Sequence, residues 1–404
     1  MSEQQQNSQP QTIPELAATG LFHFPTLETT PVVDDLIARH APVAIGVSGG
    51  KDSDVAAFET IAYLKERGHH GPVILIHSDL GRVEHKDSLP ACQRLADRLG
   101  LELVVVRRKK GDLMDRWQSR WHDNVERYSQ LECVKLILPW STPVMRFCTS
   151  ELKTAVICRE LVTRFPQQTI LSVVGIRREE SATRAQTPVC CPQPQLTSST
   201  LGTAGYNWHP ILPWTTEQVF EYHRIHQFPL HEAYGRGMSR VSCAFCILAG
   251  IGDLANSATN PENHDIYREM VDLEIASSFS FQGSRWLGNV APQLLSAEQL
   301  TGLQEAKRKA IAREHVEQLV PSHLLYKRGW PTAMPTRDEA ILLSEVRRAV
   351  ADIMQMAIEY GTPDAIIERY AELMKNNEAR NKKKPKKLPL VTFQGSLWNV
   401  EEVR

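Results

Sequence analysis

A short run of small, basic and hydroxyl-bearing residues could bind phosphate near the start of the chain. It consists of Ser48, Gly49, Gly50, Lys51, Asp52 and Ser53. Two adjacent glycines let the backbone approach an anion closely. The lysine adds a positive charge, the serines add donors, and Asp52 could accept a hydrogen bond or hold Mg²⁺. The run is not a Walker motif, which needs Gly-x-x-x-x-Gly-Lys-Ser/Thr. We predict a phosphate-binding loop of another kind.

A second candidate for anion binding is the arginine-rich segment at 175–184, which reads GIRREESATR. Guanidinium groups bind phosphate-like oxyanions through two parallel hydrogen bonds. Arg177, Arg178 and Arg184 could therefore clamp a polyphosphate or a sulfate-like group. We expect at least one of them to pair instead with a nearby carboxylate, that of Glu151, Glu179 or Glu180.

The cysteines offer a third chemistry. Cys243 and Cys246 form a Cys-x-x-Cys element, whose spacing is compatible with zinc, an iron–sulfur cluster or redox chemistry. A structural zinc site could be completed by a histidine, namely His209, His231 or His264. Three other cysteines have no partner at ligand spacing, and we interpret them as ordinary buried thiols: Cys92, Cys133 and Cys158.

The elements that must position these groups alternate between strand and helix. Apolar runs predict strands at 43–47, 73–77, 101–106 and 170–176. Helical spacing predicts helices at 54–67, at 86–99, and at 215–226 with a cap at Thr215 or Thr216. The segment 186–207 is rich in Pro, Thr, Ser, Gln and Gly, so we predict a loop or lid there. The alternation predicts an α/β fold with a doubly wound parallel sheet, Rossmann-like, followed by a helical C-terminal extension.

The length of 404 residues suggests two domains or one domain with additions. We predict a tail and lead-in at 1–40, a nucleotide-binding α/β domain at 41–235, a cysteine-containing segment at 236–295 and a helical region at 296–404. The first dozen residues are polar and are expected to be disordered. The last region carries a run of lysines at 382–387.

Bulk properties narrow the function classes. Apolar residues make up 42% and charged residues 23%, which is an ordinary globular balance, and the net charge is −1. The whole molecule therefore has no strong attraction to nucleic acid or to anionic membranes. The N-terminus lacks the apolar segment of a signal peptide, and no stretch is long and apolar enough to cross a membrane. We expect a cytoplasmic protein without a membrane partner.

Five segments in order resemble one known superfamily. SGGKDS at 48–53 is similar to the PP-loop of the ATP pyrophosphatases and of the phosphoadenosine phosphosulfate reductase superfamily. The other four resembling segments are IHSDLG at 76–81, RFCTSELK at 146–153, GIRREESATR at 175–184, and PILPW at 210–214 followed by Val219. Leu80 replaces the usual threonine of the second segment, which puts part of that nucleotide contact in doubt.

The resemblance implies a nucleotide site and names its residues. ATP with Mg²⁺ would bind the six loop residues together with Asp79, Gly81, Lys153, Gly175, Arg177 and Ser181. The residues implied in catalysis are Lys51, Asp52, Arg177 and Arg184. In resembling reductases and thiolases, cysteines at such places ligate a 4Fe-4S cluster, with Zn²⁺ as the alternative here. The ligands implied are Cys148, Cys243 and Cys246, with Cys191 or Cys190 as a fourth, although a three-cysteine cluster is also compatible.

The resemblance leaves three functions open. The sequence looks most like the ATP pyrophosphatases of DNA phosphorothioation (the DndC and SspD type), which implies adenylation of an acceptor and then sulfur incorporation. Partners implied are a sulfur donor such as a cysteine desulfurase, other proteins of the modification system, and DNA. The second function is sulfonucleotide reduction, which in resembling enzymes uses a C-terminal cysteine; none follows Cys246 here. The third is a non-catalytic nucleotide-sensing subunit.

Direct evidence for a nucleic-acid substrate is limited to two basic runs. Arg107 to Lys110 and the lysines at 382–387 could contact backbone phosphates. Solvated surface charge explains the same residues equally well.

Overall fold

The computed structural model describes residues 24–383, so the predicted tail at 1–12 and the lysines beyond 383 lie outside the described residues. Two compact units are present. The first, called the sheet unit below, comprises residues up to 120 together with 139–306. The second, called the helical unit, comprises residues 121–138 and those from 307 onward. The expected domain limits at 235 and 295 both lie inside the sheet unit, which includes residues 236–295. Those limits stay predictions.

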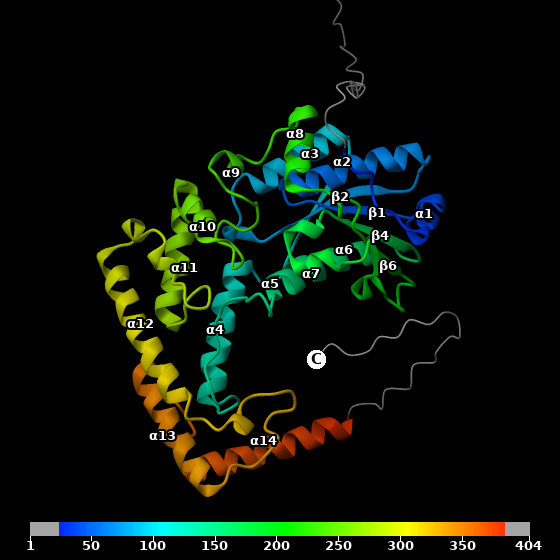
Figure 1. The fold of residues 1–404 in the computed structure, drawn as a ribbon. Coiled ribbons are helices and arrows are strands. Elements are labelled where there is room, and N and C mark those ends of the chain that lie inside the picture. The colour runs from blue at the N-terminus through cyan, green and yellow to red at the C-terminus, as the bar shows by residue number, and fades with distance from the viewer. Residues whose placement is uncertain (1–23, 384–404) are drawn as a thin grey trace, which may run out of the picture. The chain divides into compact units, whose positions relative to one another are not determined.

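The sheet unit contains a six-stranded sheet in the order β3-β2-β1-β4-β6-β5 (Figure 1). Five strands are parallel, and only β5 runs antiparallel, against β6. The strands are β1 (Val43–Gly46), β2 (Val73–Asp79), β3 (Glu102–Arg107), β4 (Thr169–Val174), β5 (Cys190–Pro192) and β6 (Ala204–Trp208). The mostly parallel α/β sheet confirms the predicted fold class, with a helical region toward the C-terminus.

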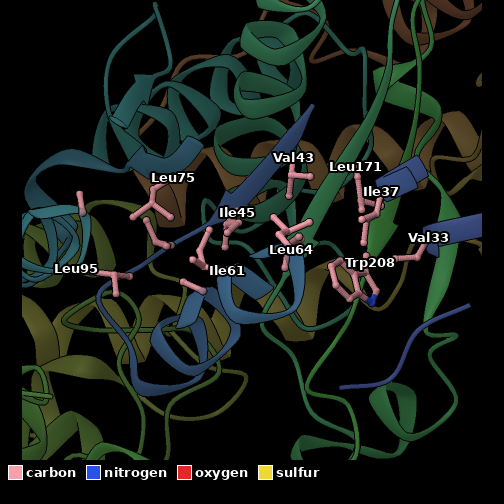
Figure 2. Packing of buried hydrophobic residues seen from close by; sticks show 14 of the residues in the cluster. Val33, Ile37, Val43, Ile45, Ile61, Leu64, Leu75, Leu95, Leu171 and Trp208 are labelled. Carbon is pink, nitrogen blue, oxygen red and sulfur yellow. The ribbon is translucent and has the colours of Figure 1, made fainter. Parts of the chain in front are cut away.

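One face of the sheet is covered by α1 (Pro31–Ala38), α2 (Lys51–Glu66) and α3 (Ser88–Leu99). Alternate side chains of β1 point to this face, so Val43 and Ile45 join the cluster, and Leu171 and Trp208 extend it across β4 and β6 (Figure 2). All four are fully buried. This two-residue alternation is what a sheet packed on both faces requires.

The opposite face is covered by α6 (Ala155–Arg164). Ala44, Ile74 and Ile170 point to this side and pack against Leu161 and Phe165 of the helix or its end. On the outer side of α2, the helix α8 (Thr216–Ile225) adds a further small cluster. The sheet is therefore the middle of a three-layer arrangement, which fixes the positions of the strand ends.

Helix α8 is capped as the sequence predicts. The Thr215 hydroxyl accepts a hydrogen bond from the Gln218 amide, and the Gln218 side chain in turn accepts one from the Thr215 amide. This reciprocal capping box satisfies two amide groups at the helix start.

The prediction of a loop or lid over 186–207 is wrong in part. Strand β5 lies within this segment, and β6 lies within it except for its last residue, Trp208. Strand β6 reads Ala-Gly-Tyr-Asn-Trp, without the apolar run expected of a buried strand. Its place is stabilised instead by pairing with β4 and by the fully buried Trp208. Tertiary packing here overrides local composition. Helix α2 also begins at Lys51, three residues before the predicted start at 54.

Further helices of the sheet unit lie between the strands and after the last strand in sequence. The shorter helices are α5 (Phe147–Thr149), α7 (Ala182–Ala185), α9 (Glu232–Gly235), α10 (Ile251–Ala258) and α11 (His264–Ser277). In α11 the fully buried Glu274 accepts hydrogen bonds from the amides of Phe281, Leu287 and Gly288. These bonds hold the loop that follows α11 in place.

Helices α13 (Arg337–Met354) and α14 (Pro363–Lys383) form the main part of the helical unit. Two long helices, α4 (Leu113–Ser129) and α12 (Ala297–Glu317), contribute their C-terminal halves to it. The fully buried guanidinium of Arg347 donates to the carbonyls of Tyr128 (2.8 Å), Ser129 (3.1 Å) and Tyr360 (3.0 Å). It thus satisfies carbonyl groups at the end of α4, which a buried helix end requires. Among the described residues, no helix is long and apolar enough to cross a membrane.

Because Leu171 is fully buried in the centre of the sheet, Leu171→Ala should lower the free energy of unfolding by about 2–5 kcal/mol. Denaturant unfolding followed by circular dichroism measures the change. The matched control is Leu300→Ala, at a position that is 37% exposed, which should change the stability by less than about 0.5 kcal/mol. Equal effects of the two substitutions would contradict the packing described above.

Candidate functional site

The candidate phosphate loop lies at the point where the strand order of the sheet reverses. The chain proceeds from β1 outward through β2 to β3, and then returns to β4 on the other side of β1. Open α/β sheets bind ligands at the carboxyl ends of the strands at such a point. The loop after β1 and the segment after β4 both start there.

The turn of the loop depends on glycine. Gly49 has φ +72°, a conformation that side chains disfavour, and a Cβ there would lie 2.8 Å from the Ser88 carbonyl oxygen. Ser53 closes the loop: its hydroxyl donates to the Gly50 carbonyl (2.7 Å) and accepts from the Ser48 amide (3.3 Å). The loop is therefore held as a rigid turn before any ligand arrives.

Several amides of this turn remain available. Within the described part of the chain, the amides of Gly49, Gly50 and Asp52 make no hydrogen bond, and no side chain caps the start of α2. Unpaired amides together with the positive end of the helix dipole form an anion site.

Lys51 is buried rather than extended into solvent. Its side chain is 3% exposed, and Nζ lies 3.1 Å from Oδ2 of Asp52. The ammonium also lies 5.4 Å from the ring centroids of both Phe220 and Tyr234, within the range of cation–π attraction. The lysine charge is thus confined beside the loop.

Tyr234, on the short helix α9, also touches the loop through its hydroxyl. The Lys51 amide donates a hydrogen bond of 3.2 Å to this oxygen. Helix α9 is fixed in turn by His231, whose Nδ1 accepts from the Ala233 amide. The tyrosine oxygen therefore accepts a hydrogen bond from an amide that could otherwise donate to a bound phosphate. Sequence reasoning missed Phe220 and Tyr234, since neither belongs to a recognisable pattern.

Arg177 joins the end of β4 to the loop. Its Nε donates to Oδ1 of Asp52 at 2.6 Å, and its Nη1 contacts Glu179 (2.9 Å) and the Thr216 hydroxyl (3.1 Å). The approach requires Gly175, because a Cβ there would lie 2.7 Å from the Asp52 carbonyl oxygen. The structure therefore brings together Lys51, Asp52, Gly175 and Arg177, which the sequence proposed separately.

Further arginines lie around the ion pair of Arg177 and Asp52. Burial, together with the positive charges of Arg240 and Arg146, lowers the pKa of Arg184 to about 10. Arg184 pairs with Glu180, which confirms the expectation that one arginine would meet a neighbouring glutamate. Arg240 makes no ion pair within the described residues. We define Arg146, Arg177, Arg184 and Arg240 as the arginine cluster.

Sequence reasoning placed one arginine wrongly and missed another. Arg178 forms a two-bond ion pair with Glu28 (2.6 and 2.9 Å) and takes no part in the cluster. Arg240 was not predicted, because it lies between motifs, three residues before Cys243. Only the folding of α9 and the following loop brings it to Arg184.

Three other residues predicted to contact the nucleotide bond to groups of the protein itself, namely Asp79, Gly81 and Ser181. Asp79 accepts from the Gly81 amide (2.7 Å) and pairs with Arg107. The Ser181 hydroxyl caps α7 by accepting from the Arg184 amide (3.2 Å). Their contacts to a nucleotide stay predictions.

Among the cysteines predicted as metal ligands, Cys148 and Cys246 lie near Cys243 and form one local group with it, whereas Cys190 and Cys191 lie on β5. Burial raises the pKa of the Cys243 thiol, and the nearby Cys246 raises it further, while Lys153 acts in the opposite direction. Cys148 is a weaker neighbour in the same environment. The Leu248 amide lies 3.4 Å from the sulfur of Cys246, a contact that stabilises a thiolate.

The proposed fourth ligands lie on β5. Cys190 packs against the core cluster of Figure 2, and Cys191 pairs in register with Asn207 of β6. Between residues 24 and 383, no three His, Cys, Asp or Glu side chains are spaced to hold a metal ion. The local group supplies suitable soft donors for a metal. It does not form a preassembled metal site.

The histidines considered as zinc ligands have other contacts. His209 bonds to the Pro188 carbonyl (2.8 Å) and His264 to the Ala258 carbonyl (3.1 Å), and His231 caps α9. A zinc site that includes them stays a prediction.

Sequence comparison adds relatives with sulfur chemistry in their names. The chain is 25% identical over 242 residues to an uncharacterized 37.8 kDa protein of Escherichia phage 186, covering 52% of this chain and 68% of that protein. It is 36% identical over 110 residues to cytoplasmic tRNA 2-thiolation protein 1 of Eremothecium gossypii, covering 26% of this chain and 29% of that protein. It is 29% identical over 102 residues to adenosine 5'-phosphosulfate reductase of Shouchella clausii, covering 25% and 37%. The chain thus spans 29% of the thiolation protein and 37% of the reductase.

Among solved structures, phosphoadenylyl-sulfate reductase of Candida auris aligns with 54% of this chain and 98% of its own, at 14% identity and a TM-score of 0.32. The family model described as the phosphoadenosine phosphosulfate reductase domain matches residues 42–249, more than half of the chain. The match begins just before β1 and ends after the Cys-x-x-Cys element, so it includes the phosphate loop and the arginine cluster. The chain belongs to the phosphoadenosine phosphosulfate reductase domain family.

Proposed function

We propose that the protein is a PP-loop ATP pyrophosphatase, which splits ATP into AMP and pyrophosphate and transfers AMP to an acceptor. The observation that carries the proposal is the pairing of an open phosphate loop with the arginine cluster at the switch point of the sheet. The loop offers unpaired amides at the start of α2. The cluster offers more positive charge than its own carboxylates neutralise.

The charges suit a leaving pyrophosphate. Cleavage at the α-phosphorus leaves a group with several negative charges, and catalysis of phosphoryl and nucleotidyl transfer depends mainly on preorganised positive groups. Asp52 already holds Lys51 and Arg177 in position, so little free energy is needed to order them when a phosphate binds. Arg240 and Arg146 lack a carboxylate partner in the described residues and are free to meet an anion. Mg²⁺ would arrive bound to the ATP phosphates.

The reaction balances without a redox partner in its first step. An acceptor oxygen attacks the α-phosphorus of ATP, a new P–O bond forms, and pyrophosphate leaves with the electrons of the broken P–O bond. A sulfur nucleophile then displaces AMP from the activated acceptor. We infer a persulfide donor, such as that supplied by a cysteine desulfurase, because the sulfur must arrive in a nucleophilic state. Its terminal sulfur displaces AMP and remains joined to the donor cysteine by an S–S bond. A second thiol then attacks the cysteine sulfur of that bond, which releases the thiolated acceptor and leaves a disulfide as the oxidised product.

The acceptor follows from resemblance alone. The proposed acceptor is a DNA backbone phosphate, as in DNA phosphorothioation, with other proteins of such a modification system as partners. A relative named for tRNA 2-thiolation supports sulfur incorporation into a nucleic acid as the general class.

Reduction of a sulfonucleotide is the second candidate, because the matching family model and one relative carry that name. The same loop and arginines would bind phosphoadenosine phosphosulfate, whose sulfate resembles a terminal phosphate. This reaction releases sulfite and needs a thiol reductant, so a sulfite assay with reduced thioredoxin distinguishes it from pyrophosphate release.

Lys51→Ala should lower the rate of pyrophosphate release from ATP by about 100- to 1,000-fold, the usual effect of removing one preorganised charge stabiliser. Release is measured with a coupled phosphate assay. Lys65→Ala is the matched control, since Lys65 is exposed at the other end of α2 and should leave the rate unchanged. An undiminished rate in Lys51→Ala, with the fold intact by circular dichroism, would refute the ATP reaction.

Tyr234→Phe should tighten ATP binding by about 2- to 10-fold, the range of one neutral hydrogen bond. The variant keeps the ring beside Lys51 but frees the Lys51 amide for a phosphate oxygen. Isothermal titration with a non-hydrolysable ATP analogue measures the affinity. Tyr63→Phe is the control, because its hydroxyl bonds to Asp34 away from the loop. Weaker binding by Tyr234→Phe would mean that the hydroxyl itself contacts the nucleotide.

The cysteine group is proposed to hold a 4Fe-4S cluster through Cys148, Cys243 and Cys246, with Cys191 or Cys190 as a possible fourth ligand and Zn²⁺ as the alternative metal. Anaerobically purified protein should then be brown and contain iron. Cys243→Ala should lose the metal, whereas Cys158→Ala, in the core on α6, should keep it. Stoichiometric zinc without iron would replace the cluster with a structural site.

A further inference from the structure

A cavity of about 340 Å³ lies within the helical unit. The proposed reaction does not use this cavity. Its volume falls in the range of roughly 300–1,000 Å³ typical of small-ligand sites. The wall is formed by the end of α4, the segment before α13, and α14. Aromatic, cationic and amide side chains line it, so its chemistry can be matched to a ligand class.

The aromatic side of the cavity offers a stacking surface. Tyr326 is 60% exposed, although tyrosine rings are usually at least half buried in a folded protein. The guanidinium of Arg127 lies 5.2 Å from its ring centroid on one side. Behind it, Trp330 is nearly buried and packs edge-on against Tyr370 at 5.3 Å. An exposed ring with a rigid support is the arrangement on which nucleic-acid bases stack.

Two arginines line the cavity. Arg127 and Arg369 both approach Glu132, at 3.9 and 3.6 Å, so neither makes a short ion pair with it. Arg369 is held in place by the Gln130 carbonyl (3.1 Å) and by an ion pair with Glu372 (2.7 Å). Arg127 is therefore the cation of the lining without a short ion pair in the described residues, and its guanidinium suits an anionic group such as a phosphate.

Amide groups on α14 complete the lining. Asn377 donates through Nδ2 to the Trp330 carbonyl at 2.8 Å, which leaves its side-chain oxygen to accept a hydrogen bond. The adjacent Asn376 is exposed at the rim. The Asn377 amide nitrogen also donates to the Gly329 carbonyl (3.3 Å), so Asn377 offers a base only its oxygen, while Asn376 carries both a donor and an acceptor, which is the pattern of a base edge.

The surroundings extend the positive charge beyond one phosphate. Lys327, Arg328 and Lys375 are exposed beside the cavity and make no ion pair within the described residues. A free mononucleotide would not need this extended basic surface, whereas a strand with several phosphates would.

We propose that the helical unit binds a single strand of nucleic acid, with one base stacked on Tyr326 inside the cavity and the flanking phosphates on Arg127, Lys327 and Arg328. A base paired in a duplex could not enter, because its faces are already stacked. The proposal goes beyond the ATP reaction and does not depend on it. If the proposed function also holds, this unit supplies the nucleic acid that the sheet unit modifies.

Binding of the full chain to fluorescently labelled single-stranded DNA of roughly 12 nucleotides, without ATP, tests the proposal by anisotropy. Tyr326→Ala should weaken binding by about 5- to 100-fold, the range for loss of a stacked aromatic ring. Tyr326→Phe should bind like the wild type. Arg348→Ala, an exposed site on α13 outside the cavity, is the charge control and should have no effect.

The salt dependence provides a second readout. Arg328→Ala should reduce the slope of log K against log salt concentration by about 0.7, as expected for one lost phosphate contact on a single strand. Equal affinities of the wild type and Tyr326→Ala would overturn the proposal. So would equal affinity for a duplex of the same sequence, or binding only to anionic phosphatidylserine vesicles. Because no ATP is present, failure here leaves the proposed ATP reaction untouched, and failure of pyrophosphate release leaves this proposal untouched.

Discussion

The carboxylate of Asp52 is the contact on which the candidate site depends. One oxygen binds the Lys51 ammonium at 3.1 Å, and the other binds the Arg177 guanidinium at 2.6 Å. Lys51 belongs to the loop after β1 and Arg177 to the segment after β4, so one side chain joins the two neighbouring strand ends. The same carboxylate holds two cations side by side at the loop, with Glu179 as a second partner of Arg177. Both the geometry and the charge needed for a polyphosphate thus depend on this residue.

The sheet explains why the carboxylate can take this role. Strands β1 and β4 are adjacent and parallel only because the chain leaves β3 and crosses back over the sheet. The close approach at their ends requires Gly175 after β4, because a Cβ there would meet the Asp52 backbone. Gly49 in the turn is required for a different contact, because a Cβ there would meet the Ser88 backbone at the start of α3. Packing on both faces of the sheet, rather than the loop sequence, sets this distance.

Sequence analysis anticipated the parts of the structure that have local causes. Apolar runs predicted β1 to β4 within a few residues, and the cap expected at Thr215 or Thr216 predicted the start of α8, because both patterns reflect contacts between near neighbours. Strand β6 was missed because its stability comes from pairing and from Trp208 rather than from its composition.

The same distinction applies to the site. The loop and Arg177 lie in recognisable patterns, whereas Tyr234 and Arg240 reach the loop only through the path of the chain around α9. The opposite case is Arg178, which sits within a pattern but binds Glu28. No local sequence feature states which face of a turn a side chain will occupy, so these assignments needed the three-dimensional structure.

The position of bond cleavage in ATP tests the central claim most directly. Incubation with ATP labelled at the α-phosphate, followed by chromatographic separation of the nucleotides, identifies the product. The account predicts labelled AMP, free or attached to an acceptor, in amounts equal to the pyrophosphate formed. Labelled ADP with inorganic phosphate would contradict it, since the loop and the arginine cluster would then serve cleavage at the terminal phosphate.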